Sequence, residues 1–181
     1  MRPLLAILLL ITLLTSCSTS RRAEKKLNKE AETHETTKTN IAPRTIKAAN
    51  AVPDDVVTFA ETLQGVRYKY DSIKKENGFD CSGFITYVFN HFDIKVPRSS
   101  VDFTNAGTPV ALQNSKRGDL ILFTGTDTTG WIVGHMGIIT ENRKGNIKFI
   151  HSSSGKNIGV IISDLAGYYS KRFVKVIRVF D

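Results

Sequence analysis

The chain has 181 residues and a formal net charge of +8, from 25 Lys and Arg against 17 Asp and Glu. Part of this excess lies in residues 18–52, where basic residues are mixed with Glu, Thr and Ala and no aromatic side chain stands among them. This absence, together with the export signal in residues 1–17, predicts no nucleic-acid partner. We find no internal repeat, and residues 53–181 suffice for one hydrophobic core.

The first seventeen residues have the pattern of an export signal. Arg2 supplies a positive charge, and residues 4–14 form an apolar stretch that is shorter than the roughly twenty residues of a membrane-spanning helix. The stretch ends in Leu14-Thr15-Ser16-Cys17, which resembles the lipobox of bacterial lipoproteins. This resemblance implies that Cys17 is acylated and anchors the chain to a membrane; the alternative is an ordinary secretory signal cut nearby. Ser18 resembles residues that permit sorting to the outer membrane, so we expect the periplasmic face of that membrane.

Residues 18–52 show no apolar period, so we expect a flexible basic tether. A flexible chain of this length has an r.m.s. span of about 30–35 Å, enough to hold a domain clear of a membrane surface. Its basic residues could contact anionic headgroups or cell-wall polymers. The expected organisation is a signal over residues 1–17, a tether over 18–52 and one folded domain over 53–181.

Helices are expected in the first half of this domain. Pro53-Asp54-Asp55 opens one that stops at Gly65, and residues 66–70 follow as a short extended piece. The next helix begins at Cys81 and ends near residues 91–93. Its apolar residues recur with the period of a helix buried on one side, at Phe84, Ile85, Val88, Phe89 and Phe92. A further short helix is expected over residues 97–106.

The second half of the domain has the pattern of strands. Short apolar or alternating runs, divided by turn residues, predict strands over residues 119–124, 135–141, 147–151, 159–163 and 173–180. Helices followed by strands favour an α+β fold, with the N-terminal helices packed on an antiparallel sheet of five to six strands.

Cys81 lies in the first helical turn, in the tetrapeptide Asp80-Cys81-Ser82-Gly83. Unpaired backbone N–H groups and the helix dipole favour an anion there, so the sequence predicts a lowered thiol pKa and a thiolate nucleophile near neutral pH. If Cys17 carries lipid, Cys81 has no disulfide partner within the chain, and a retained lone thiol in an exported protein indicates chemistry. The alternative is a cysteine that only fills space.

A cysteine nucleophile needs a base and a polar group that orients the base, and two histidines are candidates. His135 opens one predicted strand and His151 closes the next. Arg143-Lys144-Gly145 predicts a three-residue hairpin loop, which places Asn142 opposite Asn146 and Gly137 opposite His151. In that register the two histidines emerge on one face, close enough for their rings to form a hydrogen bond. A register error of one residue would place them on opposite faces.

Five motifs occur in a fixed order along the domain: Gly65-Val66-Arg67-Tyr68, Asp80-Cys81-Ser82-Gly83-Phe84, Val96-Pro97-Arg98-Ser99, Arg117-Gly118-Asp119-Leu120 and Gly134-His135-Met136-Gly137-Ile138. This series resembles the NlpC/p60 family of bacterial cell-wall cysteine peptidases, especially its small single-domain lipoproteins. The resemblance implies a papain-like α+β fold. It also implies hydrolysis of peptidoglycan stem peptides, typically between γ-linked D-glutamate and a diamino acid, without a metal or cofactor.

The resemblance also implies roles for particular residues. Cys81 matches the nucleophile, His135 the base and His151 the residue that orients the base. Tyr68 matches a tyrosine that positions the substrate or the oxyanion, and Asp80 and Ser82 match positions that contact the stem peptide. Arg98 and Asp119 match structural positions.

Three alternatives remain at this level. One cysteine and two histidines are also a ligand set for copper or zinc. A non-catalytic module could retain the fold and bind wall peptides or a partner enzyme. An amidase or acyltransferase could use the same thioester route.

Overall fold

The computed structural model describes residues 46, 48, 51–126, 130–155 and 158–180. The predicted signal over residues 1–17, with Cys17, lies outside this part of the chain, as does most of the predicted tether. Two residues assigned to the tether, Ile46 and Ala48, are instead buried in the core. Packing against the domain therefore begins before residue 53. No helix in the described ranges is long and apolar enough to cross a membrane.

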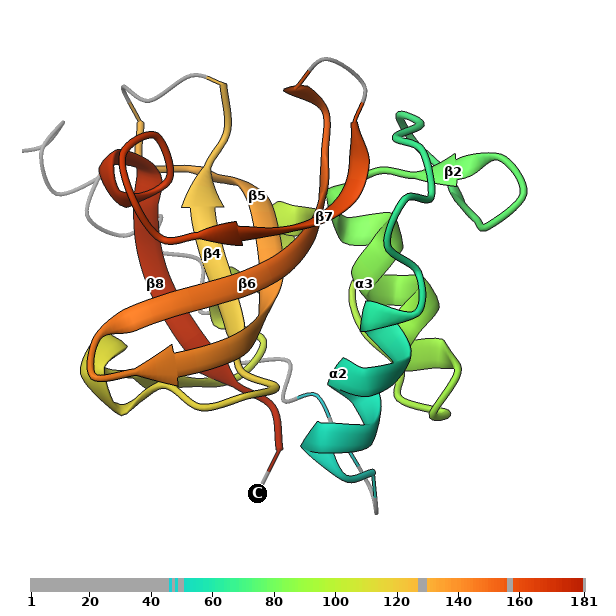
Figure 1. Cartoon of the computed structure of the whole chain (residues 1–181). Helices are drawn as coiled ribbons and strands as arrows, with labels where there is room; N and C mark the ends of the chain where they lie inside the picture. The colour runs from blue at the N-terminus through green and yellow to red at the C-terminus, as the bar shows by residue number, and fades with distance from the viewer. Residues whose placement is uncertain (1–45, 47, 49–50, 127–129, 156–157, 181) are drawn as a thin grey trace, which may run out of the picture. The chain divides into compact units, whose positions relative to one another are not determined.

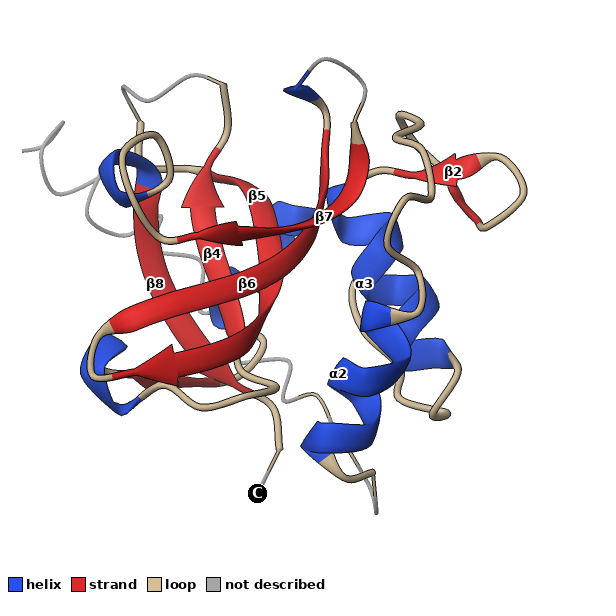
Figure 2. Ribbon diagram, in the orientation of Figure 1, coloured by secondary structure: helices blue, strands red, loops and turns tan. Residues whose placement is uncertain are grey.

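Two α-helices pack together beside the sheet (Figures 1 and 2). α2 (Pro53–Glu61) has proline at its start and two acidic residues in its first turn, which the helix dipole favours. α3 (Cys81–Asn90) begins at Cys81, as predicted, because the carboxylate of Asp80 accepts a hydrogen bond from the Gly83 N–H at 2.6 Å. The predicted apolar stripe of α3 faces the core, with Phe84, Ile85, Val88 and Phe89 fully buried and Phe92 half-buried.

The sheet has six antiparallel strands in the order β3-β8-β4-β5-β6-β7. Their bounds are β3 (Thr108–Val110), β4 (Leu120–Thr124), β5 (Val133–Arg143), β6 (Asn146–Ser153), β7 (Gly159–Asp164) and β8 (Phe173–Arg178). One core lies between the helices and the sheet, and a smaller one lies on the other face, around Phe123 and Phe149. The predicted α+β class is confirmed.

Several short elements were not predicted. β3 forms one edge of the sheet, where Pro109 is tolerated because an edge strand needs fewer N–H donors. β1 (Ile73–Lys74) and β2 (Gly78–Phe79) form a separate two-stranded hairpin before α3. The helix expected over 97–106 is a 3₁₀-helix, η1 (Ser100–Asn105), and two further 3₁₀ turns are η2 (Leu112–Asn114) and η4 (Ser170–Arg172). Elements this short carry no detectable period.

The β5–β6 hairpin corrects the predicted register at its turn. Arg143 pairs with Asn146, so the loop has two residues, Lys144 and Gly145, both with positive φ as a type I′ turn requires. The predicted pairing of Asn142 with Asn146 is therefore wrong by one residue. A β-bulge at Thr140 then adds one residue to β5, and beyond it Ile138 pairs with Ile150. Continued along the strands, this register places Gly137 opposite His151, as predicted.

Gly83 is required by a close backbone approach. A Cβ at this position would lie 2.1 Å from the carbonyl oxygen of Ser72. Gly83→Ala should therefore destabilise the fold by about 2–3 kcal/mol, because the clash outweighs the better helix propensity of alanine. Urea unfolding measures this loss. Gly130→Ala is the control, because its φ is not positive and an added Cβ would meet no atom closer than 3.4 Å, and it should change stability by about 1 kcal/mol or less. A Gly83→Ala protein as stable as the parent would contradict the packing described here.

Candidate active site

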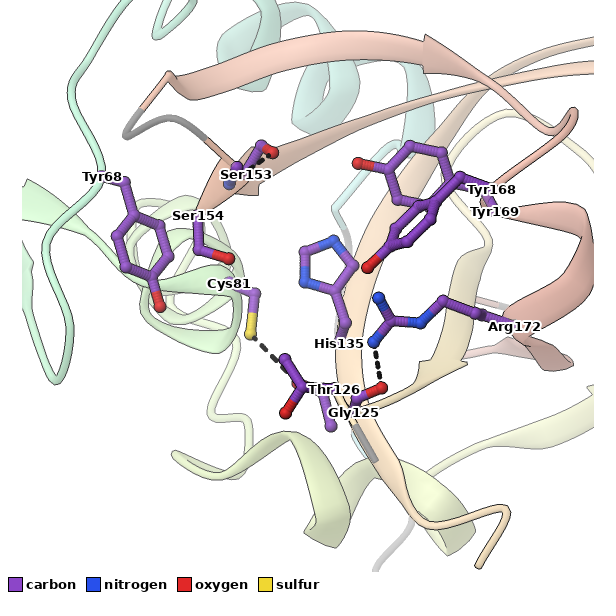
Figure 3. A pocket seen from close by; sticks show the side chains of 12 residues that line it. Tyr68, Cys81, Gly125, Thr126, His135, Ser153, Ser154, Tyr168, Tyr169 and Arg172 are labelled. Atoms are coloured by element: carbon purple, nitrogen blue, oxygen red, sulfur yellow. Dashed lines mark hydrogen bonds between the residues drawn. The ribbon is translucent and has the colours of Figure 1, made fainter. Parts of the chain in front are cut away.

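Cys81 opens onto a pocket of about 460 Å³ between the start of α3 and the end of the sheet that carries His135 (Figure 3). The pocket is within the size range of sites for small ligands. The Sγ of Cys81 lies 3.8 Å from the carbonyl oxygen of Gly134, a contact in which a protonated thiol is the donor. The pocket wall also includes Tyr68, Ser153, Ser154, Tyr168, Tyr169 and Arg172.

The two histidine rings are in direct contact. His135 Nε2 lies 2.9 Å from His151 Nδ1, and the rings are nearly perpendicular at 87°. Gly137 leaves the space for this pair, because a Cβ there would lie 3.1 Å from the Cβ of His151 and 2.8 Å from the Ile150 carbonyl oxygen. The predicted hydrogen bond between the rings is therefore present.

The histidine pair continues to a hydroxyl that the sequence analysis missed. His151 Nε2 lies 2.9 Å from the Oγ of Ser163 on β7. When His151 Nε2–H donates to Ser163, its Nδ1 accepts the Nε2–H of His135. That tautomer leaves His135 Nδ1 with a lone pair for the thiol. Tyr169 packs against both rings, with centroid distances of 6.2 Å to His135 and 5.1 Å to His151.

The ionisation of the site differs from the sequence prediction. Burial, followed by the carboxylate of Asp80, raises the pKa of Cys81 to about 11 and outweighs the backbone N–H groups at the helix start, which act to lower it. Burial, and then the charge of Arg172, lowers the pKa of His135 to about 4. Burial also lowers the pKa of His151 far below its usual range. The expectation of a lowered thiol pKa is wrong for the free protein, where thiol and imidazole are both neutral at pH 7.

Because the Cys81 thiol and the His135 imidazole are both neutral at pH 7, we expect slow alkylation of Cys81. In a Cys17→Ser protein, the rate of iodoacetamide labelling should rise about tenfold per pH unit from pH 7 to 10, because the thiolate forms only as the pH approaches the thiol pKa of about 11. Site-resolved mass spectrometry measures the rate. A thiolate–imidazolium pair would instead give fast labelling with a plateau between pH 5 and 8, and that profile would contradict the neutral pair.

A second pocket of about 340 Å³ lies on the other flank of Cys81 and contains Asp80 and Ser82. Both side chains are buried, and Arg98 holds them: it binds Asp80 Oδ2 at 2.5 Å and Ser82 Oγ at 3.0 Å. Arg98 therefore stabilises the N-cap of α3, in keeping with its expected structural position.

Tyr68 lines both pockets. Burial, then the neighbouring Cys81 and Asp80, raises the pKa of its phenol, so the hydroxyl stays protonated and can donate a hydrogen bond. Tyr68, Cys81 and His135 therefore line one pocket, and His151 is joined to it by the hydrogen bond to His135. Asp80 and Ser82 lie on the other flank of Cys81, in the second pocket.

Ser163 and Arg172 were not among the predicted site residues. In the pairing of β6 with β7, His151 lies opposite Ile161 and Phe149 opposite Ser163, so Ser163 is a diagonal neighbour of His151. A prediction of this register could therefore have found Ser163. No residue pattern marks Arg172, which follows the turn after β7. In the part of the chain that the structure describes, no three His, Cys, Asp or Glu side chains gather as metal ligands.

Comparison with known proteins gives a consistent result. Residues 65–178 match the model of the NlpC/P60 family. The chain is 34% identical over 136 residues to a gamma-DL-glutamyl hydrolase of Bacillus subtilis (strain 168), covering 74% of this chain and 32% of that protein. It is 36% identical over 120 residues to the murein DD-endopeptidase MepS/murein LD-carboxypeptidase of Escherichia coli (strain K12), covering 65% of this chain and 58% of that protein. The chain therefore spans about a third of the length of the first relative and somewhat over half of the length of the second.

The fold is also found among solved structures. A crystal structure of an NlpC/P60 family protein from Bacillus cereus ATCC 10987 superposes with a TM-score of 0.64 at 25% identity, over 73% of this chain and 41% of that one. The papain-like α+β fold and the family resemblance predicted from the sequence are confirmed.

Proposed function

The chain belongs to the NlpC/P60 family, and from this we propose that it is a cysteine peptidase that hydrolyses peptide bonds in peptidoglycan stem peptides. The observation that carries the proposal is one pocket lined by Cys81 and His135, with His135 bound to His151 at 2.9 Å. The names of the relatives, a gamma-DL-glutamyl hydrolase and a murein endopeptidase, support the substrate class.

In the proposed mechanism, His135 Nδ1 takes the proton of the Cys81 thiol while the sulfur attacks the carbonyl carbon of the peptide. The oxyanion accepts hydrogen bonds from the backbone N–H of Cys81, at the start of α3, and from the Tyr68 hydroxyl. One such donor lowers a barrier by about 3–4 kcal/mol. The proton on His135 Nδ1 then passes to the leaving amine, and the C–N bond breaks to give a thioester. His135 next deprotonates a water that attacks the thioester, which releases the acid and restores the thiol.

The bond we propose joins γ-D-glutamate to the diamino acid of the stem. A relative of this chain, 30% identical over 152 residues, is named gamma-D-glutamyl-L-lysine dipeptidyl-peptidase. Mass spectrometry of defined muropeptides tests the bond. Release of L-alanyl-γ-D-glutamate supports this bond, whereas release of D-alanine or cleavage of a crosslink would identify a different one. Tight binding of intact muropeptides without any product would favour the non-catalytic module.

We further propose that Cys17 carries a lipid that holds the domain at the periplasmic face of the outer membrane. The support is the motif Leu14-Thr15-Ser16-Cys17 followed by Ser18. Fractionation of cells that make the full chain tests this: Cys17→Ser should move the protein from the membrane to the soluble fraction, while Ser16→Ala should leave it at the membrane. Recovery of the Cys17→Ser protein with the membrane would contradict the anchor.

A further inference from the structure

The pocket beside His135 holds a guanidinium whose hydrogen-bonding capacity is only partly used. Arg172 lines the pocket with Cys81 and His135, and in Figure 3 the His135 ring lies between Cys81 and Arg172. The Nη2 of Arg172 donates to the carbonyl oxygen of Thr124, at 2.7 Å, and to that of Gly125. Its Nε is buried and has no hydrogen-bond partner. This Nε–H has almost no exposed surface, and no hydrogen bond joins Nη1 to a described residue, so the Nη1 N–H groups are the donors that remain for a ligand.

No carboxylate of the described residues pairs with Arg172. The ion pairs in the described ranges involve Arg98, Arg117, Arg143, Lys148 and Arg178. The described residues that line the pocket include no Asp or Glu, whereas the pocket on the other flank of Cys81 contains Asp71 and Asp80. The Arg172 side chain is held in place by the two carbonyls and by Tyr168, whose ring centroid lies 4.7 Å from Cζ. It is therefore a fixed cationic group that faces a pocket without a described counter-charge.

The proposed chemistry shows which part of the substrate meets this group. His135 gives its proton to the leaving amine, so the residue that supplies this amine must lie on the His135 side of Cys81. Arg172 lines the pocket on that side and is absent from the other one. Nη2 already donates to two carbonyl oxygens, so a carboxylate would bind at Nη1, and such charge-assisted bonds are stronger than neutral ones.

Resting on the function proposed above, we propose that Arg172 binds a carboxylate of the leaving residue and so selects substrates that carry a free acid next to the cleaved bond. Two carboxylates have this chemistry: the main-chain carboxylate of a stem that ends at the diamino acid, and the side-chain carboxylate of a diaminodicarboxylic acid. The site would thus prefer acidic leaving residues over amidated ones.

Three peptides test this selection: L-Ala-γ-D-Glu-L-Lys as free acid, the same peptide as C-terminal amide, and L-Ala-γ-D-Glu-diaminopimelate with only its main-chain carboxyl amidated. The free acid or the diaminopimelate peptide should exceed the lysine amide by about 10- to 100-fold in kcat/KM. A fast free acid assigns the pairing to the main-chain carboxylate, and a fast diaminopimelate peptide assigns it to the side chain. Equal kcat/KM for all three peptides would overturn the inference.

Substitutions of Arg172 and of the neighbouring Lys171 test whether the preference for the acid depends on Arg172. In Arg172→Gln the ratio between the preferred acid and the amide should fall to about threefold or less. In Arg172→Lys it should be intermediate, because an ammonium keeps the charge but loses the planar group that the Thr124 and Gly125 carbonyls hold in place. Lys171→Gln removes the same charge from the exposed neighbouring residue and should keep the full ratio. Equal losses on both substrates in Arg172→Gln would show that Arg172 only braces the Thr124 and Gly125 backbone, and would overturn the proposal.

A binding measurement separates this inference from the proposed activity. Calorimetry with the Cys81→Ala protein compares the affinities for the same three peptides without turnover. Binding of an acidic peptide about tenfold or more tighter than the amide supports the Arg172 site even if the parent protein cleaves none of them, in which case only the proposed hydrolysis fails. Equal affinities would overturn the Arg172 site.

Discussion

Replacing Cys81 by alanine should lower the kcat for stem-peptide hydrolysis by about 10⁵- to 10⁶-fold, the scale of loss seen when a nucleophile of a hydrolase is removed. The reason is that the thioester cannot form without Sγ, and no other thiol lies in the described residues. The release of soluble fragments from purified peptidoglycan, followed by chromatography, measures this loss.

The same variant should fold normally. Cys81 is half-buried at the edge of a pocket, and its Sγ makes one weak contact, 3.8 Å from the Gly134 carbonyl oxygen, so its removal leaves no core cavity. Its melting temperature should match that of the parent protein. Cys17→Ser is the matched cysteine control and should keep full activity in detergent-free assays. A Cys81→Ala protein that digests peptidoglycan at more than about 1% of the parent rate would rule out the thioester route.

Replacing His135 by alanine should lower kcat/KM by about 10³- to 10⁴-fold. The thiol pKa of about 11 makes the base indispensable, because almost no thiolate exists at pH 7 without a partner that accepts the proton. The loss should also persist at high pH, where thiolate forms by itself, because the leaving amine still needs the proton that His135 delivers.

His91→Ala provides the matched control for this change. His91 caps the C-terminal end of α3 and stacks on Phe59, away from both pockets beside Cys81. Its replacement should leave kcat/KM within about threefold of the parent value. Equal losses in His135→Ala and His91→Ala would indicate a general effect on folding, and circular dichroism of both variants would reveal it.

The hairpin shows how far the sequence predicts this site. The alternation of side chains and the glycine at position 145 were sufficient to predict a hairpin with both histidines on one face. The loop has two residues rather than three, which by itself would have moved the histidines to opposite faces. The bulge at Thr140 reverses this shift, and no pattern in the sequence predicts a bulge there. The predicted contact is correct, but one step of the argument for it is not.

The ionisation of Cys81 was mispredicted for a different reason. A helix N-terminus lowers a thiol pKa, and the sequence does place Cys81 there. The opposing factors are burial, which depends on how α3 packs against the sheet, and the carboxylate of Asp80, which caps the same helix. The motif therefore determines the position of the thiol, but its pKa depends on tertiary packing.

Ser163 and Arg172 illustrate what local patterns cannot supply. Both come from the C-terminal part of the domain and reach the site only through the pairing of β6 with β7 and the turn that follows β7. Contacts between residues so distant in sequence depend on the complete fold. The same holds for Ile46, whose burial could not be inferred from a polar segment without an apolar period.

The most direct test of the account is whether His151 acts only through His135. A double-mutant cycle measures kcat/KM for His151→Ala in the parent and in the His135→Ala background. We expect His151→Ala to cost about 10²-fold or more in the parent, because the tautomer and orientation of His135 are lost, and less than about threefold when His135 is already absent. Equal losses in the two backgrounds would contradict a cysteine and two histidines that work as one unit.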